Sequence, residues 1–473
     1  MSKDYKILIG GQWRKTGRAL DVTSPFDGSR AGTTYVAGQA ELEDALSAAQ
    51  AAFETLKRYP AYQRAAVIKK VVDGLVSREE ELSRVIALEA GKPIRDCRPE
   101  VRRAANTFQI ALEESKRMDG TVLPLDIFPG SEGRMGIVRR FPVGVVLGIS
   151  PFNFPLNLVA HKVAPAMACG CPIIIKPASK TPLSALILGE IITEAGWPDG
   201  GVNIVPCSGA DAERLLDDTR IKKLTFTGSA AVGWRLKAKA GPRKVTLELG
   251  GNAGVIIHSD ADIKHAAQRC AIGAFSYAGQ ICISVQRIYV HKDVFEEFKT
   301  AFLANCAALK SGDPLDETTD IGPMIEEAAA ARTEGWVREA VAQGASLLVG
   351  GGRTGAFMEP TVLTGTRPSM KVCGEEVFAP VATLEQYNTF EEAVVDVNRG
   401  LYGLQAGVFT RDMGRILYAF EHLEVGGVIA NDIPTYRVDN MPYGGVKMSG
   451  FGREGIRYAM EEMTEMRLLA LKA

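Results

Sequence analysis

Hydrophobic residues in the first third of the chain recur at the spacing of amphipathic helices. Between residues 40 and 58 they fall on one helical face, and the same spacing predicts a second helix around residues 68–75. Ser77, with Glu80 three residues later, forms a capping-box pattern that predicts the start of a third helix. Gly91 is the residue expected to end it.

From residue 143 onward, short runs of β-branched residues alternate with helical patterns. Helices are predicted at 183–195 and 211–217, and apolar strands at 143–149, 172–176, 202–205, 223–227, 245–249 and 255–257. The alternation resumes after residue 290, with a helix at 294–309 and strands at 407–410 and 426–430. Strands and helices in this order favour parallel sheets covered on both faces. We therefore expect an α/β fold with two successive α/β units.

Two glycine-rich segments resemble nucleotide-binding loops, but each lacks a required part. Residues 350–355 match Gly-x-Gly-x-x-Gly, yet a proline and β-branched residues follow where the dinucleotide fingerprint needs a helix. We interpret this segment as a surface turn. Residues 228–233 begin like a P-loop, but Trp234 and Arg235 replace the required lysine and hydroxyl residue, which disfavours ATP chemistry.

Composition narrows the class of protein. The 473 residues are 46% hydrophobic and 23% charged, as in a globular protein with a large core. The 55 basic and 56 acidic residues give a net charge of −1 without a long like-charge run, so we expect no nucleic-acid partner. The apolar run at residues 7–9 is too short for a signal peptide, and polar residues interrupt the apolar region 143–175. We expect a cytoplasmic protein without a membrane anchor.

Three residues are candidates for catalysis. The eight cysteines lack metal-binding spacings, so we expect no metal site and mostly inert thiols, with Cys282 the candidate nucleophile after a glycine and small residues. Glu248 ends an apolar strand before two glycines, which suits a desolvated general base or equally a salt-bridged strand-end glutamate. Asn153 lies between two prolines that fix its backbone, as an oxyanion-binding amide or an ordinary turn asparagine would require.

These segments belong to a longer series of motifs, and together they resemble the aldehyde dehydrogenase superfamily along nearly the whole chain. In order, the motifs are Pro151-Phe152-Asn153-Phe154-Pro155, Lys176-Pro177-Ala178-Ser179, Phe226-Thr227-Gly228-Ser229, Leu247-Glu248-Leu249-Gly250-Gly251, Gly279-Gln280-Ile281-Cys282, Glu375-Glu376-Val377-Phe378-Ala379-Pro380 and Pro442-Tyr443-Gly444-Gly445. The interval from Glu248 to Cys282 also matches that of the family.

The resemblance implies that the chain oxidises an aldehyde to the carboxylic acid with a nicotinamide cofactor. Cys282 would attack the aldehyde carbon, and the Asn153 side chain and the Cys282 backbone N–H would hold the oxyanion. Glu248 would activate the water that hydrolyses the thioester. The family's coenzyme-A-acylating branch typically lacks this glutamate, so its presence implies a free acid as product.

The family's cofactor residues also carry over. Lys176 would bind the adenosine ribose, and the pyrophosphate would lie near a strand-to-helix turn formed by Gly228, Ser229 and Gly233. Glu376 would bind the nicotinamide ribose, with Phe378 packed nearby. The plain alternatives for this last pair are a surface acid and a core aromatic.

Cofactor preference depends on Ser179. NAD-preferring relatives usually carry glutamate at this position, where its carboxylate binds the ribose 2′-hydroxyl and repels a 2′-phosphate. A serine hydroxyl can donate to phosphate, and Lys176 adds positive charge. We expect NADP to be favoured and NAD to remain usable, unless Ser179 only caps the following helix.

The fold that the resemblance implies has two Rossmann-type α/β domains and a β-arm for oligomerisation. The expected boundaries are 1–118 and 141–247 for the cofactor-binding domain, 248–448 for the catalytic domain, and 119–140 and 449–473 for the arm and tail. The alternating apolar run 467–472 would otherwise be an exposed strand edge. We expect it to pair with the arm of another subunit in a homodimer or homotetramer.

Three further residues favour a small polar aldehyde. Asn157 and His161 are four apart, so they share one face of a helix in the region that lines the family's substrate tunnel. Arg437 lies in a segment that resembles lactaldehyde dehydrogenases and would hold a carboxylate or phosphate. A hydroxyaldehyde and a semialdehyde both fit. The plain alternatives are a surface arginine paired with Asp439 and a histidine bonded within its own helix.

Two other functions remain open at this level. A cysteine hydrolase or esterase would need a histidine near Cys282, and His258, His265 and His291 are the candidates by proximity in the sequence. A non-catalytic cofactor-binding protein on the same fold, like the lens crystallins of this family type, would not need the intact candidate residues.

Overall fold

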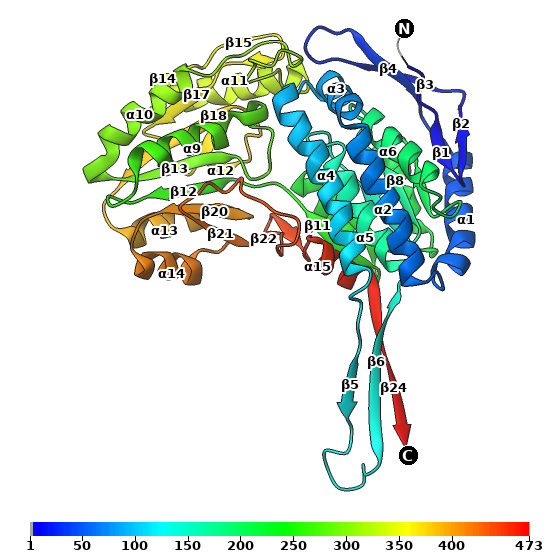
Figure 1. Cartoon of the computed structure of the whole chain (residues 1–473). Helices are drawn as coiled ribbons and strands as arrows, with labels where there is room; N and C mark the ends of the chain where they lie inside the picture. The colour runs from blue at the N-terminus through cyan, green and yellow to red at the C-terminus, as the bar shows by residue number, and fades with distance from the viewer. Residues whose placement is uncertain (1–2, 473) are drawn as a thin grey trace.

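Two α/β lobes, each built on one large sheet, and a long β-arm make up the molecule (Figure 1). The computed structural model describes residues 3–472. The predicted α/β fold with two successive units is confirmed. No described helix is long and apolar enough to cross a membrane.

The first sheet has eight strands in the order β2-β1-β9-β8-β7-β10-β11-β23. The strands from β9 to β11 are parallel, and they are the buried apolar runs that the sequence predicts. The antiparallel strands β1 and β23 flank them. The bounds are β1 Ile7–Ile9, β2 Gln12–Arg14, β7 Val145–Ile149, β8 Ile173–Lys176, β9 Val202–Ile204, β10 Ile221–Thr227, β11 Lys244–Glu248 and β23 Gly450–Phe451.

Helices cover both faces of this sheet. Alternate residues of a strand point to opposite faces, so Val145 and Leu147 pack with α1 and α8, whereas Val146 packs with α2 to α6. The bounds are α1 Gln39–Leu56, α2 Ala61–Ser77, α3 Glu79–Ala90, α4 Ile94–Glu114, α5 Asn157–Cys169, α6 Leu183–Glu194, α7 Gly209–Arg214, η1 Leu215–Asp217, α8 Ala230–Ala240 and α15 Ile456–Glu462.

The predicted capping box at the start of α3 is wrong. Ser77 is the last residue of α2, and its hydroxyl donates to the carbonyl of Gly74. Arg78 alone separates the two helices and occupies the N-cap position of α3. The predicted end of α3 is confirmed, because Gly91 adopts the left-handed conformation with φ 66°.

The second sheet has seven strands in the order β14-β17-β18-β13-β12-β20-β21. Val255 and Ile257 pack with helices α9 to α11 on one face, and Ile256 packs with α13 and α14 on the other. The bounds are β12 Ala253–Ile257, α9 Ile263–Phe275, η2 Ser276–Gly279, β13 Val285–His291, η3 Lys292–Val294, α10 Phe295–Ala307, α11 Glu327–Ala342, β14 Ser346–Val349, β17 Thr361–Thr364, α12 Lys371–Gly374, β18 Val381–Tyr387, α13 Phe390–Asn398, β20 Gln405–Phe409, α14 Met413–His422 and β21 Gly427–Ala430.

Short strand pairs complete the two lobes. The glycine-rich segment after β14 leads into a hairpin and not a helix, which confirms the interpretation as a turn. These pairs are β3 Ala19–Thr23 with β4 Arg30–Tyr35, β15 Arg353–Thr354 with β16 Phe357–Met358, and β19 Tyr402–Gly403 with β22 Val446–Lys447.

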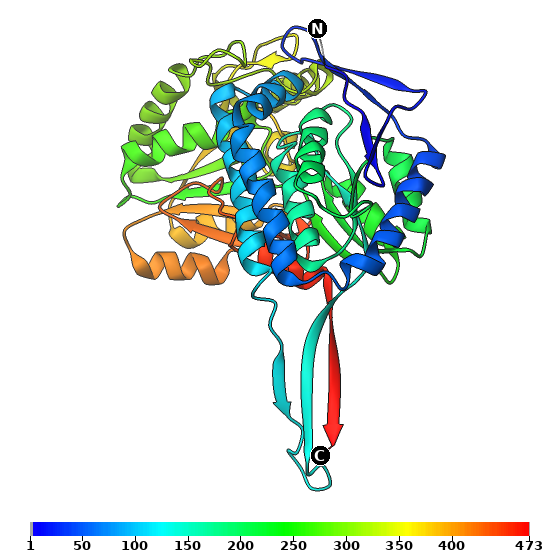
Figure 2. The same cartoon turned by 45° about the vertical axis from the view of Figure 1, so that its right-hand side comes forward.

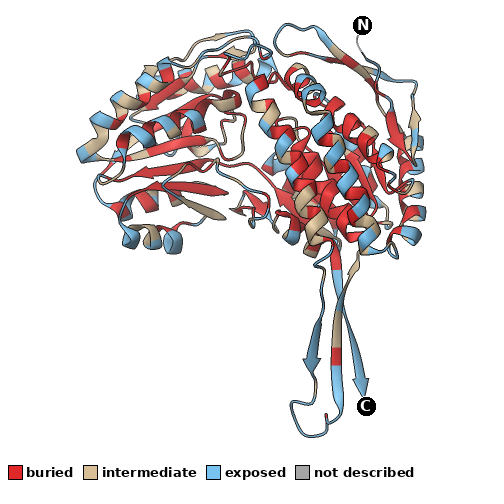
Figure 3. Ribbon diagram, in the orientation of Figure 1, coloured by how far each residue is buried: buried red, intermediate tan, exposed pale blue. Residues whose placement is uncertain are grey.

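The arm is a three-stranded sheet that stands clear of both lobes (Figures 1 and 2). Its strands are β5 Thr121–Pro124, β6 Arg134–Pro142 and β24 Thr464–Lys472. The predicted pairing of the C-terminal run with another subunit is wrong, because β24 pairs antiparallel with β6 of its own chain, from Thr464↔Pro142 to Lys472↔Arg134. Most arm residues are exposed (Figure 3), including Ile127, Phe128 and Leu469.

The chain passes between the two main sheets through a short link. Strand β11 ends at Glu248 and β12 begins at Ala253, so only four residues separate the last parallel strand of one sheet from the first strand of the other. Gly250 and Gly251 lie in this link, and Gly250 lines the cavity between the lobes. Glu248, at the end of β11, therefore lies beside a crossing point between the lobes.

Candidate active site

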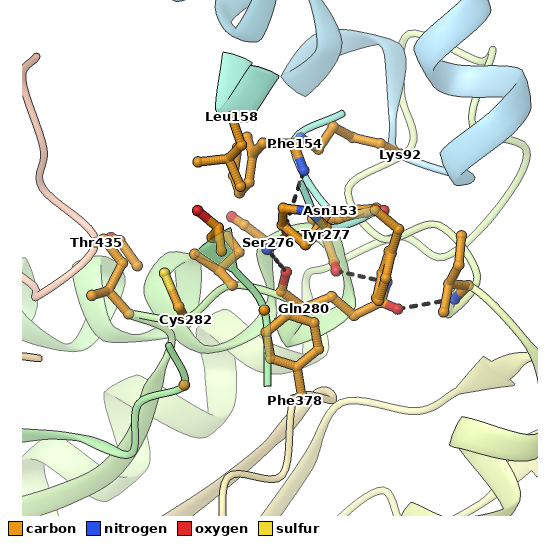
Figure 4. Close-up of a pocket in the computed structure, with 18 of the residues that line it drawn as sticks. Lys92, Asn153, Phe154, Leu158, Ser276, Tyr277, Gln280, Cys282, Phe378 and Thr435 are labelled. Atoms are coloured by element: carbon orange, nitrogen blue, oxygen red, sulfur yellow. Dashed lines mark hydrogen bonds between the residues drawn. The ribbon is translucent and has the colours of Figure 1, made fainter. Parts of the chain in front are cut away.

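A cavity of about 610 Å³ lies between the lobes (Figure 4). It brings together residues from both sheets and from helix α4. The predicted site residues in its wall are Asn153, Asn157, Gly228, Ser229, Glu248, Cys282, Glu376, Phe378 and Arg437. The predicted residues that do not line it are His161, Lys176, Ser179 and Gly233.

The loop that carries Cys282 is held in an unusual backbone conformation. Tyr277 and Ala278 have φ angles of 49° and 51°, a region that non-glycine residues rarely adopt. Gly279 follows at φ 67°, and a Cβ there would lie 2.2 Å from the carbonyl oxygen of Ala379. The fully buried Gln280 donates from Nε2 to the Tyr277 carbonyl at 3.3 Å. These constraints fix the position of the thiol.

Cys282 is the one described cysteine that is not fully buried. Its Sγ lies 3.2 Å from the hydroxyl oxygen of Tyr443. Burial, and next the neighbouring Glu248 carboxylate, raise the pKa of the Cys282 thiol well above its ordinary value. The sulfur is therefore protonated at neutral pH and must lose a proton to act as a nucleophile.

Glu248 ends strand β11 and is 2% exposed. Burial, and next the charge of Glu454, raise the pKa of Glu248 to about 8. Among the described residues Glu248 takes part in no ion pair, so it is not the salt-bridged strand-end glutamate of the plain alternative. The Tyr443 hydroxyl donates to its Oε1 at 3.5 Å. A carboxylate with this pKa is suited to accept protons near neutral pH.

The two glycines after Glu248 permit a close approach of three chain segments. A Cβ on Gly251 would lie 2.1 Å from the carbonyl oxygen of Cys282, and one on Gly250 would lie 2.2 Å from Oε2 of Glu376. The Gly251 N–H donates to Oε1 of Glu376 at 3.0 Å. Only glycine lets Glu248, the loop of Cys282 and Glu376 meet here.

Asn153 is oriented by its neighbours. Its Nδ2 donates to the carbonyl of Gln280 at 2.9 Å, and its Oδ1 accepts from the Phe154 N–H at 3.1 Å (Figure 4). The amide nitrogen therefore points toward the loop of Cys282. Because an amide nitrogen carries two N–H groups, one donor is left for a ligand in the cavity.

The side chain of Arg437 lies in the cavity wall and is 5% exposed. Its guanidinium carbon lies 3.5 Å from the ring centroid of Tyr443, and its Nη2 donates to Glu454 at 3.0 Å. Nη2 also contacts Nδ1 of His161 at 2.9 Å. Among the described residues, Nη2 is the only guanidinium nitrogen of Arg437 with a hydrogen-bond partner, so most of its donors are unused.

His161 lies behind Arg437. Its Nε2 contacts Asp439 at 2.9 Å, and Asp439 also pairs with Arg103 at 2.7 Å. Asn157 lines the cavity, and its Nδ2 lies 3.4 Å from His161. The plain alternatives are therefore not what the structure shows: Arg437 is buried and pairs with Glu454, and His161 bonds mainly outside its own helix.

The sequence did not single out the contribution of helix α4. Asp96, Glu100 and Arg103 line the cavity at spacings of four and three residues, and this one-face pattern of charges is the signal that was available. Glu100 pairs with the buried Lys92 at 2.5 Å and accepts from the Asn157 N–H at 3.2 Å. Helix α4 therefore holds the start of α5, beside Asn153.

Other contributors were also missed. The sequence places Tyr443 within a motif but gives it no separate role, and Glu454 lies outside every motif. Lys162 is fully buried and donates to Thr227 at 2.6 Å and to Glu454 at 3.3 Å. A lysine inside the apolar pattern of α5 was a signal for this cluster, because a buried lysine needs partners.

Of the residues predicted to hold the cofactor, Gly228, Ser229, Glu376 and Phe378 line the cavity between the lobes. Gly228 and Ser229 precede α8, and the N-cap residue Ser229 makes no side-chain capping bond, so N–H donors face the cavity. A Cβ on Gly233 would lie 2.3 Å from Leu249, so this glycine lets α8 pack against the sheet. Free N–H groups at a helix N-terminus suit an anionic group such as a phosphate.

The side chains predicted to contact the two riboses of the cofactor differ in how deeply they are buried. Lys176 ends β8, and burial lowers its pKa. Ser179 is exposed and does not cap α6, whose first N–H groups are bound by the buried Glu89. Burial raises the pKa of Glu376 to about 7. Phe378 packs edge-to-face against Phe152 at 5.9 Å. The described residues contain no metal-binding cluster.

Comparison with known proteins identifies the family. The sequence profile of the aldehyde dehydrogenase family matches residues 13–469. The chain belongs to the aldehyde dehydrogenase family. It is an NAD(P)-dependent aldehyde dehydrogenase that oxidises a small aldehyde to the acid, which confirms the predicted reaction class.

Individual relatives cover almost the whole chain. A 3-sulfolactaldehyde dehydrogenase from Priestia aryabhattai is 46% identical over 99% of this chain and 98% of the relative. The crystal structure of aldehyde dehydrogenase 21 from Physcomitrella patens, in complex with the reaction product succinate, is 48% identical, with a TM-score of 0.98 over 100% and 99% of the two chains. A glyceraldehyde-3-phosphate dehydrogenase from Methanocaldococcus jannaschii, complexed with NADP, is 37% identical, with a TM-score of 0.93 over 97% and 100%.

Proposed function

We propose that this aldehyde dehydrogenase acts on a small aldehyde that carries an anionic group close to the carbonyl. The observation that carries the proposal is the buried Arg437 in the cavity wall, with most of its guanidinium donors unused. Arg103 lines the same cavity and uses Nε and Nη2 for Asp439. Two guanidinium groups in one wall favour a carboxylate or sulfonate, because charged hydrogen bonds to such oxygens are strong and directional.

Similar proteins support this substrate class. The 46% identical relative is named for 3-sulfolactaldehyde, and the 48% identical structure holds succinate. Both compounds are small and carry an anionic group, as do the semialdehydes. Asn157 adds a neutral polar group to the wall, which suits a hydroxyl beside the carbonyl. We therefore place sulfolactaldehyde and succinic semialdehyde first among the candidate substrates, ahead of the uncharged lactaldehyde.

The catalytic roles follow from the geometry of the cavity. The Sγ of Cys282 attacks the carbonyl carbon, and the free N–H of Asn153 and the Cys282 backbone N–H stabilise the oxyanion. A bound NAD(P) would supply the hydride acceptor, and loss of hydride from the tetrahedral carbon would leave a thioester on Cys282. Glu248 then takes a proton from the water that hydrolyses this thioester. The product is the free acid.

The cofactor would lie across the first lobe and the cavity between the lobes. Lys176 and Ser179 would contact the adenosine ribose, and the N-terminus of α8 would bind the pyrophosphate. Glu376 and Phe378, from the second lobe, would lie against the nicotinamide ribose. NADP is preferred, because Ser179 presents a hydroxyl where a carboxylate would repel the 2′-phosphate. Solved relatives of 34% and 33% identity are described as NADP-dependent and NAD-dependent, so relatives of both kinds exist.

The proposed division of the chain gives cofactor binding to residues 1–118 and 141–247, the catalytic loop to 248–448, and subunit contact in a homodimer or homotetramer to the arm and tail at 119–140 and 449–473. Within the tail, β23 and α15 pack with the first sheet, so strand β24 is the part available for this contact. The exposed apolar residues of the arm support this role, since a single chain leaves them in water. The rival hydrolase function is disfavoured, because His258, His265 and His291 do not line the cavity.

A substrate panel tests the proposal. Wild type, Arg437→Ala and the exposed control Arg457→Ala are assayed with sulfolactaldehyde, succinic semialdehyde and hexanal, following reduced cofactor at 340 nm. Loss of a buried charged contact costs about 2–5 kcal/mol, so Arg437→Ala should lose at least about 30-fold in kcat/KM for the anionic aldehydes. The ratio to hexanal separates this loss from a general defect. A best kcat/KM for hexanal, with an unchanged ratio in Arg437→Ala, would overturn the substrate class.

A further inference from the structure

The Tyr443 hydroxyl lies between the two groups that the mechanism needs to connect. It is 3.2 Å from Sγ of Cys282 and donates to Oε1 of Glu248 at 3.5 Å. The second distance is long for a hydrogen bond, as catalytic contacts often are before substrate binds. One hydroxyl therefore contacts both the nucleophile and the base.

The ring of Tyr443 cannot move away from this position. Its residue is 1% exposed and packs with Ile283 and Leu404. The guanidinium of Arg437 stacks on the ring at 3.5 Å. The Tyr443 backbone pairs with Glu454 in both directions, with N–H to carbonyl distances of 3.0 and 2.6 Å. The apolar packing, the stacked guanidinium and the backbone hydrogen bonds together hold the Tyr443 hydroxyl in its position beside Cys282 and Glu248.

The thiol has a proton to lose. Because the sulfur is protonated at neutral pH, forming the carbon–sulfur bond requires that this proton reach an acceptor. Glu248 is the buried carboxylate beside it, and both side chains contact the same hydroxyl. A hydroxyl can accept one proton while it donates another.

We propose that Tyr443 is a catalytic residue that relays the thiol proton of Cys282 to Glu248. This proposal rests on the roles assigned to Cys282 and Glu248 above. As the sulfur–carbon bond forms, the S–H proton passes to the Tyr443 oxygen while the Tyr443 proton passes to Oε1 of Glu248. The carbonyl electron pair becomes the oxyanion. Tyr443 ends neutral, and Glu248 ends protonated.

The same relay runs in reverse at the end of the cycle. Glu248 first releases its proton to solvent and then takes one from the attacking water. As the thioester carbon–sulfur bond breaks, Tyr443 gives its proton to the sulfur and recovers one from Glu248. Each cycle therefore releases one proton overall and returns the thiol, the phenol and the carboxylate to their starting forms.

Tyr443→Phe tests the relay, because it removes only the hydroxyl and keeps the ring under Arg437. Tyr436→Phe is the matched control, since Tyr436 lies on the same loop and is 49% exposed. We measure the pre-steady-state burst of reduced cofactor, the rate of Cys282 alkylation by iodoacetamide, and cofactor affinity. General acid–base catalysis contributes about 10²–10⁴-fold, so Tyr443→Phe should slow the burst at least about 100-fold. Alkylation should slow, and cofactor affinity should be unchanged.

A burst in Tyr443→Phe within twofold of wild type, with an unchanged alkylation rate, overturns the relay. A proton inventory of the wild-type enzyme is a second test that needs no variant. If two protons move in the same step, the burst rate depends on the deuterium fraction of the solvent along a bowed curve. A linear dependence contradicts the relay. Cys282→Ala and Glu248→Gln run in parallel. Full turnover in either of these overturns the proposed mechanism itself, whereas their loss with normal Tyr443→Phe overturns only the relay.

Discussion

Turnover should rise about tenfold between pH 7 and pH 9, because Glu248 must be ionised to activate water. With a pKa of about 8, the carboxylate is roughly 10% ionised at pH 7 and roughly 90% ionised at pH 9. The unmodified side chain, at 4.5, would be fully ionised over this whole range and would give a flat profile. The slope therefore reports the burial of this one group.

Neighbouring charges should move this profile in predictable directions. The Arg437 guanidinium lowers the pKa of Glu248, so Arg437→Met should shift the rise to higher pH. The assay is kcat at saturating substrate and cofactor from pH 6 to 9.5, at constant ionic strength. Glu248→Gln should slow the burst of reduced cofactor, because the thiol proton loses its acceptor, and it should also slow the later hydrolysis; neither phase should show the rise between pH 7 and pH 9.

The free energy of unfolding should also depend on the ionisation of Glu248, but it should fall with rising pH while turnover rises. Because the folded-state pKa of Glu248 is raised, the folded protein binds the proton more tightly, and stability falls as pH rises from 4.5 through about 8. The full displacement corresponds to on the order of 5 kcal/mol. Glu248→Gln should therefore unfold at a higher temperature than wild type at pH 9. A flat wild-type kcat between pH 7 and 9, or the same slope in Glu248→Gln, would refute the reasoning.

Three further changes have defined outcomes. Ser179→Glu should lower the NADP/NAD ratio of kcat/KM by at least about tenfold through repulsion of the 2′-phosphate, and an unchanged ratio would contradict the assigned site. Gly251→Ala should reduce kcat/KM about 100-fold, because the new Cβ would lie 2.1 Å from the Cys282 carbonyl oxygen. Circular dichroism shows whether this variant folds, and Gly209→Ala is the control, because a Cβ there would have no atom within 4 Å. Leu469→Glu, on the exposed face of β24, should reduce the molar mass measured by light scattering, and an unchanged mass would exclude this face from the subunit contact.

Local patterns predicted the parallel strands well, because each is a buried apolar run with helices on either side. Strand β7, with all five residues buried, is the plainest case. The start of α3 was mispredicted because α2 and α3 are separated by Arg78 alone, and a capping pattern cannot show that a helix is still continuing through Ser77. The partner of β24 was mispredicted for a different reason: an alternating apolar strand reveals that its edge needs pairing but not which chain supplies the pair.

The residues of the candidate site also divide into those that a local motif predicts and those that only a long-range contact reveals. Cys282, Glu248 and Asn153 were predicted because each lies in a compact motif, and the folded chain brings all three into the wall of one cavity. Arg103 was missed because its partner, Asp439, is far away in the sequence, and only the folded chain brings the two within 2.7 Å. The packing of Tyr443 against the thiol likewise depends on a contact across 161 residues.

The four-residue link between the sheets has a mechanical consequence. Glu248 ends the last parallel strand of one lobe, and the carbonyl of Cys282, in the other lobe, lies against Gly251 of the link itself. Glu248 and Cys282 are thus connected through a main-chain contact at the link, and not only through side chains on two separate lobes. The chain also crosses back from β21 to β23, and ion pairs such as Arg98–Glu317 join the lobes elsewhere. The spacing of the carboxylate and the thiol is therefore set by the backbone at the link, and substitutions that loosen the surface contacts between the lobes should leave this spacing unchanged.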